Sequence, residues 1–175
     1  LPNGPAPVSS GSSPTQLAED GDVATWANGL LPEGSTLAVP PGIFGSARWR
    51  IKHPILVTWK DGGAALPDRE FAITWRDRVE GVCGRILEQI DLPAKSTGFG
   101  RVQVLRRGMR LSGTEFTRRA LHLGCMGSTH MLTRQPEELP AGARLVGTYS
   151  PGKERSRAPT NIWQIFHVSP DPVLS

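Results

Sequence analysis

The chain has 175 residues, of which 38% are hydrophobic, and carries a formal net charge of +4. This length suits one domain with a modest core and a flexible end, and the sequence holds no run of about 18 apolar residues that could span a bilayer. The basic balance permits an acidic partner, a nucleic acid or an anionic surface, and it selects none of them.

The N-terminal part of the chain is expected to be a flexible linker followed by a helix. Residues 1–14 are rich in Pro, Gly and Ser, which favours a linker, and residues 15–175 form the single predicted domain. A helix is predicted from Thr15, with Val23 in its apolar stripe and a stop signal that begins at Asn28.

The rest of the chain predicts a mixture of strands and one further helix. The predicted elements are, in chain order, a loop over residues 30–44, strands over 49–52, 55–59 and 71–75, a helix over 79–90, and strands over 102–105, 144–149 and 162–168. The turn signal at 61–63 predicts an antiparallel hairpin between the second and third strands. The expected fold is therefore α+β, with the N-terminal helix packed on an antiparallel sheet.

The only two cysteines, Cys83 and Cys125, have three interpretations. In an exported domain they pair as a disulfide, which the sequence favours. In a cytosolic protein they are buried free thiols. The third interpretation makes Cys125 a nucleophile with His122 or His130 as its base, which requires a thiolate beside an imidazole and an oxyanion hole.

No metal site, cofactor or catalytic residue is expected. His122, Cys125 and His130 have His-x2-Cys-x4-His spacing, but a structural zinc site needs four ligands at paired spacings. His53 and His167 are expected to be structural. The sequence contains neither a Gly-rich phosphate loop nor a dinucleotide-binding fingerprint.

The densest charge feature is a run of arginines with little acidic offset. It consists of Arg101, Arg106, Arg107, Arg110, Arg118 and Arg119. These residues either form a solvated face or dock an acidic neighbouring subunit or a polyanion. The five tryptophans either stack sugars at an adhesive site or pack in the core and at its rim, and the second interpretation is favoured.

Four segments resemble one known family in their order and spacing. Residues 26–30 resemble the end of an N-terminal pilin helix, and residues 42–44 resemble a loop segment before a sheet. Residues 71–87, with Cys83, and residues 120–127, with Cys125, resemble the segments that carry two paired cysteines. The layout is similar to the globular head of a type IVb pilin, the class that includes the toxin-coregulated pilin.

This resemblance implies a disulfide between Cys83 and Cys125, a packing role for the helix over 16–28, and no catalytic residues. It implies a structural subunit of a type IVb-like pilus that contributes to filament assembly and adhesion. The expected partners are other pilin subunits, the assembly machinery and a surface receptor, and nucleic acid is not expected. The pilus is extracellular, and before assembly the subunit would face the periplasm, held in the inner membrane by an apolar helix expected before Leu1.

Two features qualify this interpretation. About fifty residues follow Cys125, which favours a minor or variant subunit over a major pilin. Residues 139–150 resemble a strand segment of the channel protein of type IV secretion, so a component of that channel is one alternative. The other alternative is an exported Cys-dependent enzyme or toxin domain centred on Cys125.

Overall fold

The computed structural model of the protein describes residues 14–40, 47–58, 61, 68–90, 105, 113–134, 143–151 and 162–169. Their helices are α1 (Pro14–Leu30), α2 (Ala47–Arg50), α3 (Arg69–Cys83), the 3-10 helix η2 (Leu87–Gln89), α5 (Gly113–Thr117) and α6 (Ala120–Cys125). The strands are β1 (Leu37–Ala38), β2 (His130–Arg134), β3 (Ala143–Tyr149) and β4 (Trp163–Val168). No helix in the described part of the chain is long and apolar enough to cross a membrane.

The strands form one sheet in the order β1-β2-β4-β3, which confirms an α+β fold. The expectation of a purely antiparallel sheet is wrong, because β1 pairs with β2 in parallel while β2, β4 and β3 are antiparallel neighbours. The two residues of β1 run parallel to β2. The chain between these two strands is long and carries α2, α3, α5 and α6.

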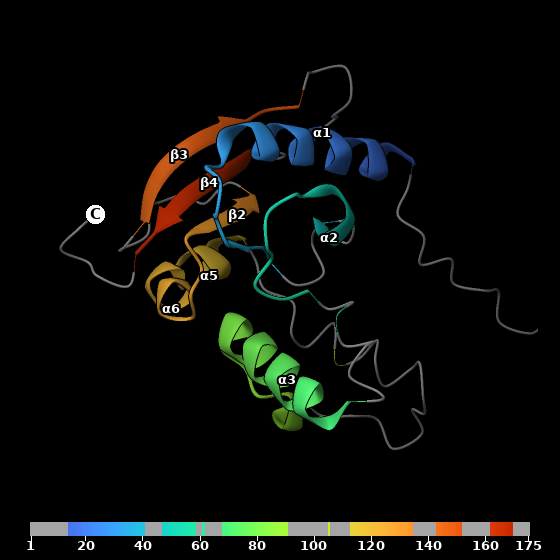
Figure 1. The fold of residues 1–175 in the computed structure, drawn as a ribbon, viewed down its shortest axis with the longest axis vertical. Helices are drawn as coiled ribbons and strands as arrows, with labels where there is room; N and C mark the ends of the chain where they lie inside the picture. The colour runs from blue at the N-terminus through green and yellow to red at the C-terminus, as the bar shows by residue number, and fades with distance from the viewer. Residues whose placement is uncertain are drawn as a thin grey trace, which may run out of the picture.

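Helix α1 lies along one face of the sheet (Figure 1). Its residues Val23 and Ala27 are fully buried, in the same apolar cluster as Leu132 on β2 and Ile165 on β4. Gly147 on β3 allows the close approach, because a Cβ atom there would lie 2.5 Å from Cδ2 of Leu30 and 3.3 Å from Cζ2 of Trp26. The lack of a side chain at Gly147 therefore allows α1 to pack closely on the sheet.

A polar contact also joins α1 to the central strand β4. The indole Nε1 of Trp163 donates a hydrogen bond to Oε1 of Glu19 at 3.1 Å, across 144 positions of sequence. Arg134 on β2 lies 3.6 Å from the same carboxylate oxygen, and its guanidinium carbon is 5.0 Å from the centroid of the Trp163 ring. One carboxylate thus holds the first described helix, β2 and β4 together.

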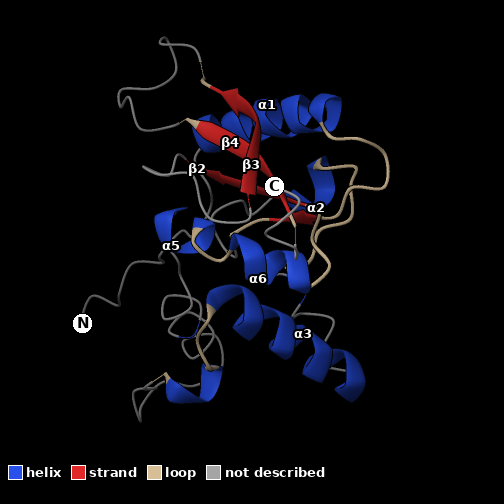
Figure 2. Cartoon of the chain, turned by 90° about the vertical axis from the view of Figure 1, so that its left-hand side faces the viewer, coloured by secondary structure: helices blue, strands red, loops and turns tan. Residues whose placement is uncertain are grey.

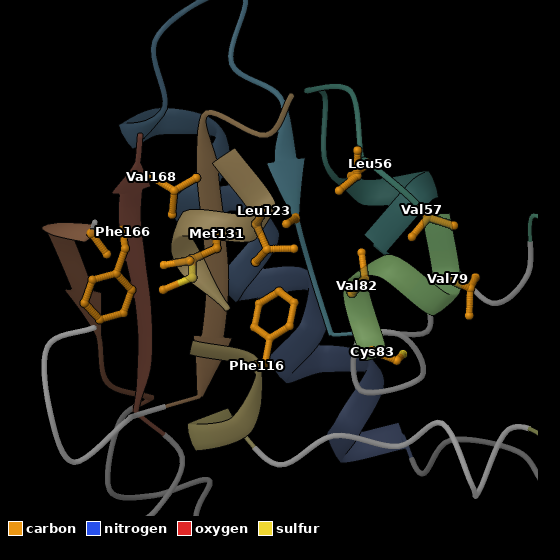
Figure 3. Close-up of a cluster of buried hydrophobic side chains, with 13 residues drawn as sticks. Leu56, Val57, Val79, Val82, Cys83, Phe116, Leu123, Met131, Phe166 and Val168 are labelled. Carbon is orange, nitrogen blue, oxygen red and sulfur yellow. The ribbon is translucent and has the colours of Figure 1, made fainter. Parts of the chain in front are cut away.

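The opposite face of the sheet is covered by α5 and α6, with α3 packed outside α6 (Figure 2). Figure 3 shows the apolar cluster between these layers, with Phe116 of α5 near its centre. Phe166 on β4 and Val82 on α3 belong to the same cluster. The core therefore has two parts, one on each side of the sheet.

Helix α3 replaces a predicted strand and shifts a predicted helix. The alternation of Phe71, Ile73 and Trp75 suggested a strand, but the side chain of Asp68 accepts a hydrogen bond from the Phe71 N–H and begins a helix there. The helix ends at Gly84, whose φ of 66° favours glycine. The predicted helix over 79–90 is therefore wrong after Cys83, and Ile86 is 46% exposed instead of buried.

Neither the predicted hairpin nor the strand predicted over residues 49–52 occurs among the described residues. Residues 47–50 are the helix α2, and Ile55 makes only an isolated parallel bridge to Leu37. Other predicted segments lie outside the described residues: 1–13 of the linker, the loop segment 42–44, Trp59, the turn residues 62–63, and 102–104 of a strand.

Candidate functional site

Three titratable side chains lie side by side on the sheet face that α1 covers only in part. His130 on β2 is the register partner of His167 on β4, and His167 is the register partner of Arg144 on β3. Directly opposed residues of antiparallel strands place their side chains on the same face of the sheet. The two imidazole centroids are 5.2 Å apart, with one ring edge-on to the other at 85°. We call these three residues the His–Arg row.

The His–Arg row lines an open cavity of about 460 Å³, which we call the histidine pocket. The other lining residues come from the end of α1 and the loop after it, from the start of β2, and from β3. They are Leu30, Pro32, Glu33, Gly34, Ser35, Thr129 and Val146. This volume lies in the range of pockets that hold small ligands.

A tight turn after α1 forms one side of the histidine pocket. The Ser35 N–H donates to the Pro32 carbonyl at 3.2 Å, and the Ser35 hydroxyl donates to the same oxygen at 2.7 Å. Gly34 has a φ of 80°, which this kind of turn requires of its third residue. Glu33 is therefore positioned at the pocket by this turn and not by a helix or a strand.

The hydrogen bonds around Thr129 define how His130 faces the pocket. The Thr36 carbonyl accepts the N–H groups of Thr129 and His130, at 2.9 and 3.1 Å. The Thr129 hydroxyl donates to the same carbonyl at 3.2 Å, accepts the Thr36 N–H at 2.9 Å and lies 3.0 Å from Nδ1 of His130. These contacts fix the position of the His130 ring beside Thr129.

Burial, followed by the positive charges of His167, His53 and Arg144, lowers the pKa of His130 to about 4. Its imidazole is therefore neutral at pH 7 and offers one N–H donor instead of a full charge. Such a group can stabilise an oxygen of a ligand without transferring a proton to it.

The remaining charges of the histidine pocket are opposite in sign. The side chains of Arg144 and Glu33 are both exposed, and neither takes part in an ion pair among the described residues. Both are therefore available to a ligand. The carbonyl end of α1, at Leu30, adds partial negative charge on the side of Glu33.

The expected disulfide is not formed, because both cysteines are free thiols. Cys83 is buried at the end of α3, in the cluster that holds Phe116, whereas Cys125 is exposed at the end of α6. A disulfide requires the two Cβ atoms to lie about 4 Å apart, which these positions do not allow. Burial raises the pKa of Cys83 to about 11 despite the positive charges of Arg119 and Arg85, so its thiol stays protonated.

The cluster of His122, Cys125 and His130 does not come together. His122 and Cys125 are exposed on α6, which packs against one face of the sheet, whereas the buried His130 faces the other side. No group of three or more potential metal ligands occurs within the described residues. His130 is therefore not placed to act as a base for Cys125.

Among the described residues, the arginines of the run do not form a charged face and the tryptophans do not form a stacking site. Arg118 is exposed, whereas Arg119 donates to the Gly81 carbonyl at the end of α3 and so has a structural role. The other four arginines of the run lie outside the described residues. Trp163 is buried, whereas Trp49 is 81% exposed on α2.

The sequence did not indicate the histidine pocket. The strands that carry Arg144 and His167 were predicted, but His167 was interpreted as structural and the strand that begins at His130 was not predicted. Only the pairing register of three strands brings these residues together. The signal that could have suggested the pocket is the presence of a histidine or an arginine at the end of three strands.

The comparisons with known proteins found no relative. No protein-family model matches the chain, and neither the curated proteins nor the solved structures contain a match to it.

Proposed function

We propose that this domain binds a small anionic ligand in the histidine pocket. The observation that carries the proposal is the His–Arg row, in which one guanidinium and two imidazoles are register neighbours on one face of the sheet. A guanidinium binds carboxylate or phosphate through two parallel hydrogen bonds, and the imidazoles of His130 and His167 lie beside it in the sheet. The row supports binding, and it requires neither a metal ion nor a nucleophile.

Replacing Arg144 with glutamine is expected to weaken the binding of inorganic phosphate about 10- to 100-fold. The reason is the loss of charged hydrogen bonds, which contribute about 1.5–3 kcal/mol each. His167→Gln is expected to weaken binding in the same direction. The measurement is an NMR titration with phosphate, in which the ring signals of His130 and His167 are followed.

The matched controls for this experiment are Arg118→Gln and His122→Gln, since both residues are exposed on the opposite side of the sheet. They are expected to bind phosphate as the unaltered protein does. If no saturable shift of the two ring signals occurs, or if the controls lose binding equally, the histidine pocket is not an anion site.

A structural subunit of a type IVb-like pilus is the second candidate. It is favoured by one observation, namely that α1 lies along the sheet with Val23 and Ala27 buried against it, as the resemblance implies for the helix of a pilin head. The free state of Cys83 and Cys125 removes the disulfide from this comparison. In this role the pilin subunits would be partners, and the chain would be displayed on an extracellular filament.

The pilus candidate predicts that a longer version of the chain, with an apolar helix of about 20 residues before Leu1, assembles into filaments. Residues 1–175 alone are expected to remain monomeric or to associate weakly, because that helix would supply the assembly surface. Electron microscopy of the longer protein and light scattering of the shorter one are the measurements. A gene that encodes only a cleavable secretory signal before Leu1 would exclude this candidate.

A further inference from the structure

The histidine pocket has chemically different ends. Its cationic end is the His–Arg row, and its apolar end is made by Leu30 and Val146. Val146 lies two positions after Arg144 on β3, at an irregularity of the strand between Leu145 and Gly147, where α1 approaches closely. Leu30 and Val146 both pack against the apolar cluster under α1, so they form one apolar surface beside the row.

Glu33 gives the histidine pocket a third kind of surface, which a ligand has to match. It lines the same cavity from the turn after α1, close in sequence to the carbonyl end of that helix. A carboxylate accepts hydrogen bonds only, and both of its oxygens can accept from neighbouring hydroxyl groups. A ligand that is anionic throughout would be repelled by Glu33, whereas a ligand with hydroxyl groups near it would be bound.

We propose that the ligand of the histidine pocket is a nucleoside monophosphate, which deepens the proposed function and rests on it. The phosphate binds the His–Arg row, where three phosphate oxygens match the guanidinium and imidazole donors better than the two oxygens of a carboxylate do. The ribose hydroxyls donate to Glu33, and the base packs on Leu30 and Val146. The cavity of about 460 Å³ is larger than a phosphate ion needs and lies within the range for ligands of this size.

The experiment compares four compounds by calorimetry: adenosine 5′-monophosphate, ribose 5-phosphate, adenosine and inorganic phosphate. The nucleotide is expected to bind at least about 10-fold more tightly than each of the other three, since only it occupies both ends of the pocket. If ribose 5-phosphate or inorganic phosphate binds as tightly as the nucleotide, the inference is overturned.

Glu33→Gln separates the sugar contact from the phosphate contact. The substitution removes a negative charge, so it is expected to strengthen binding of inorganic phosphate and to weaken binding of adenosine 5′-monophosphate severalfold. Glu70→Gln, an exposed change on α3, is the matched control and is expected to alter neither. Equal strengthening of both ligands by Glu33→Gln would overturn the assigned role of Glu33 and the nucleotide with it.

The two proposals fail differently. If phosphate binds through Arg144 and His167 but the nucleotide has no advantage over it, the anion site stands and its ligand is not a nucleotide. If none of the phosphate-bearing compounds binds, the proposed function is itself wrong.

Discussion

Replacing Phe116 with alanine is expected to lower the free energy of unfolding by about 3–5 kcal/mol, the usual result for a buried aromatic ring. Phe116 is fully buried, and α5 places it in the cluster shared by Val82 of α3, Leu123 of α6 and Phe166 of β4. Its removal would leave a cavity where the outer helices meet the sheet (Figure 3). Urea denaturation monitored by tryptophan fluorescence measures the change.

Phe71→Ala provides the matched control, because it deletes the same ring from a side chain that is 39% exposed on α3. We expect it to cost about 1 kcal/mol or less. Similar losses for the two variants would show that Phe116 does not hold the layers together. A changed denaturant slope would indicate a different unfolding reaction instead.

Acidification is expected to destabilise the domain by about 1–3 kcal/mol through His130 alone, because its pKa is lowered from 6.5 to about 4 and solvent in the open pocket screens part of the effect. A histidine with a lowered pKa binds fewer protons when folded than when unfolded, so its contribution to stability is intact above pH 6.5. That contribution is lost progressively as the pH falls to about 4. The groups near the ring are His167, His53, Arg144 and, across the pocket, Glu33.

The comparison of the protein with its His130→Gln variant isolates this effect, since the carboxylates titrate in both. The free energy of unfolding, measured by urea denaturation at several pH values, should fall more steeply for the unaltered protein than for the variant as the pH falls from 6.5 to 4. A constant difference across this range would mean that His130 keeps an ordinary pKa in the folded protein.

The elements that the sequence predicted well are those whose local pattern matches their final environment. The helix expected from Thr15 to Asn28 is observed as Pro14–Leu30, and the two last strands are observed within a residue or two of their predicted ends. The helix has local start and stop signals, and both strands are rich in β-branched and aromatic residues, which favour the strand conformation.

The elements that the sequence predicted wrongly depend on distant or competing contacts. Phe71 and Ile73 alternate as a strand would, but they are exposed on α3, so their pattern does not report burial. The cap at Asp68 decides the conformation instead. The His–Arg row depends on a register between β2 and β4, which are about thirty residues apart, and no local pattern contains that register.

The hydrogen bond between Glu19 and Trp163 has a consequence for how the chain folds. It joins positions 144 residues apart, and the central strand β4 is the last described strand to be synthesised. Neither α1 nor β3 can complete its packing before that strand arrives, so the cost of closing long loops is incurred before most native contacts form. Folding should therefore be slow for a domain of this size, and during synthesis α1 cannot complete its packing until β4 has left the ribosome.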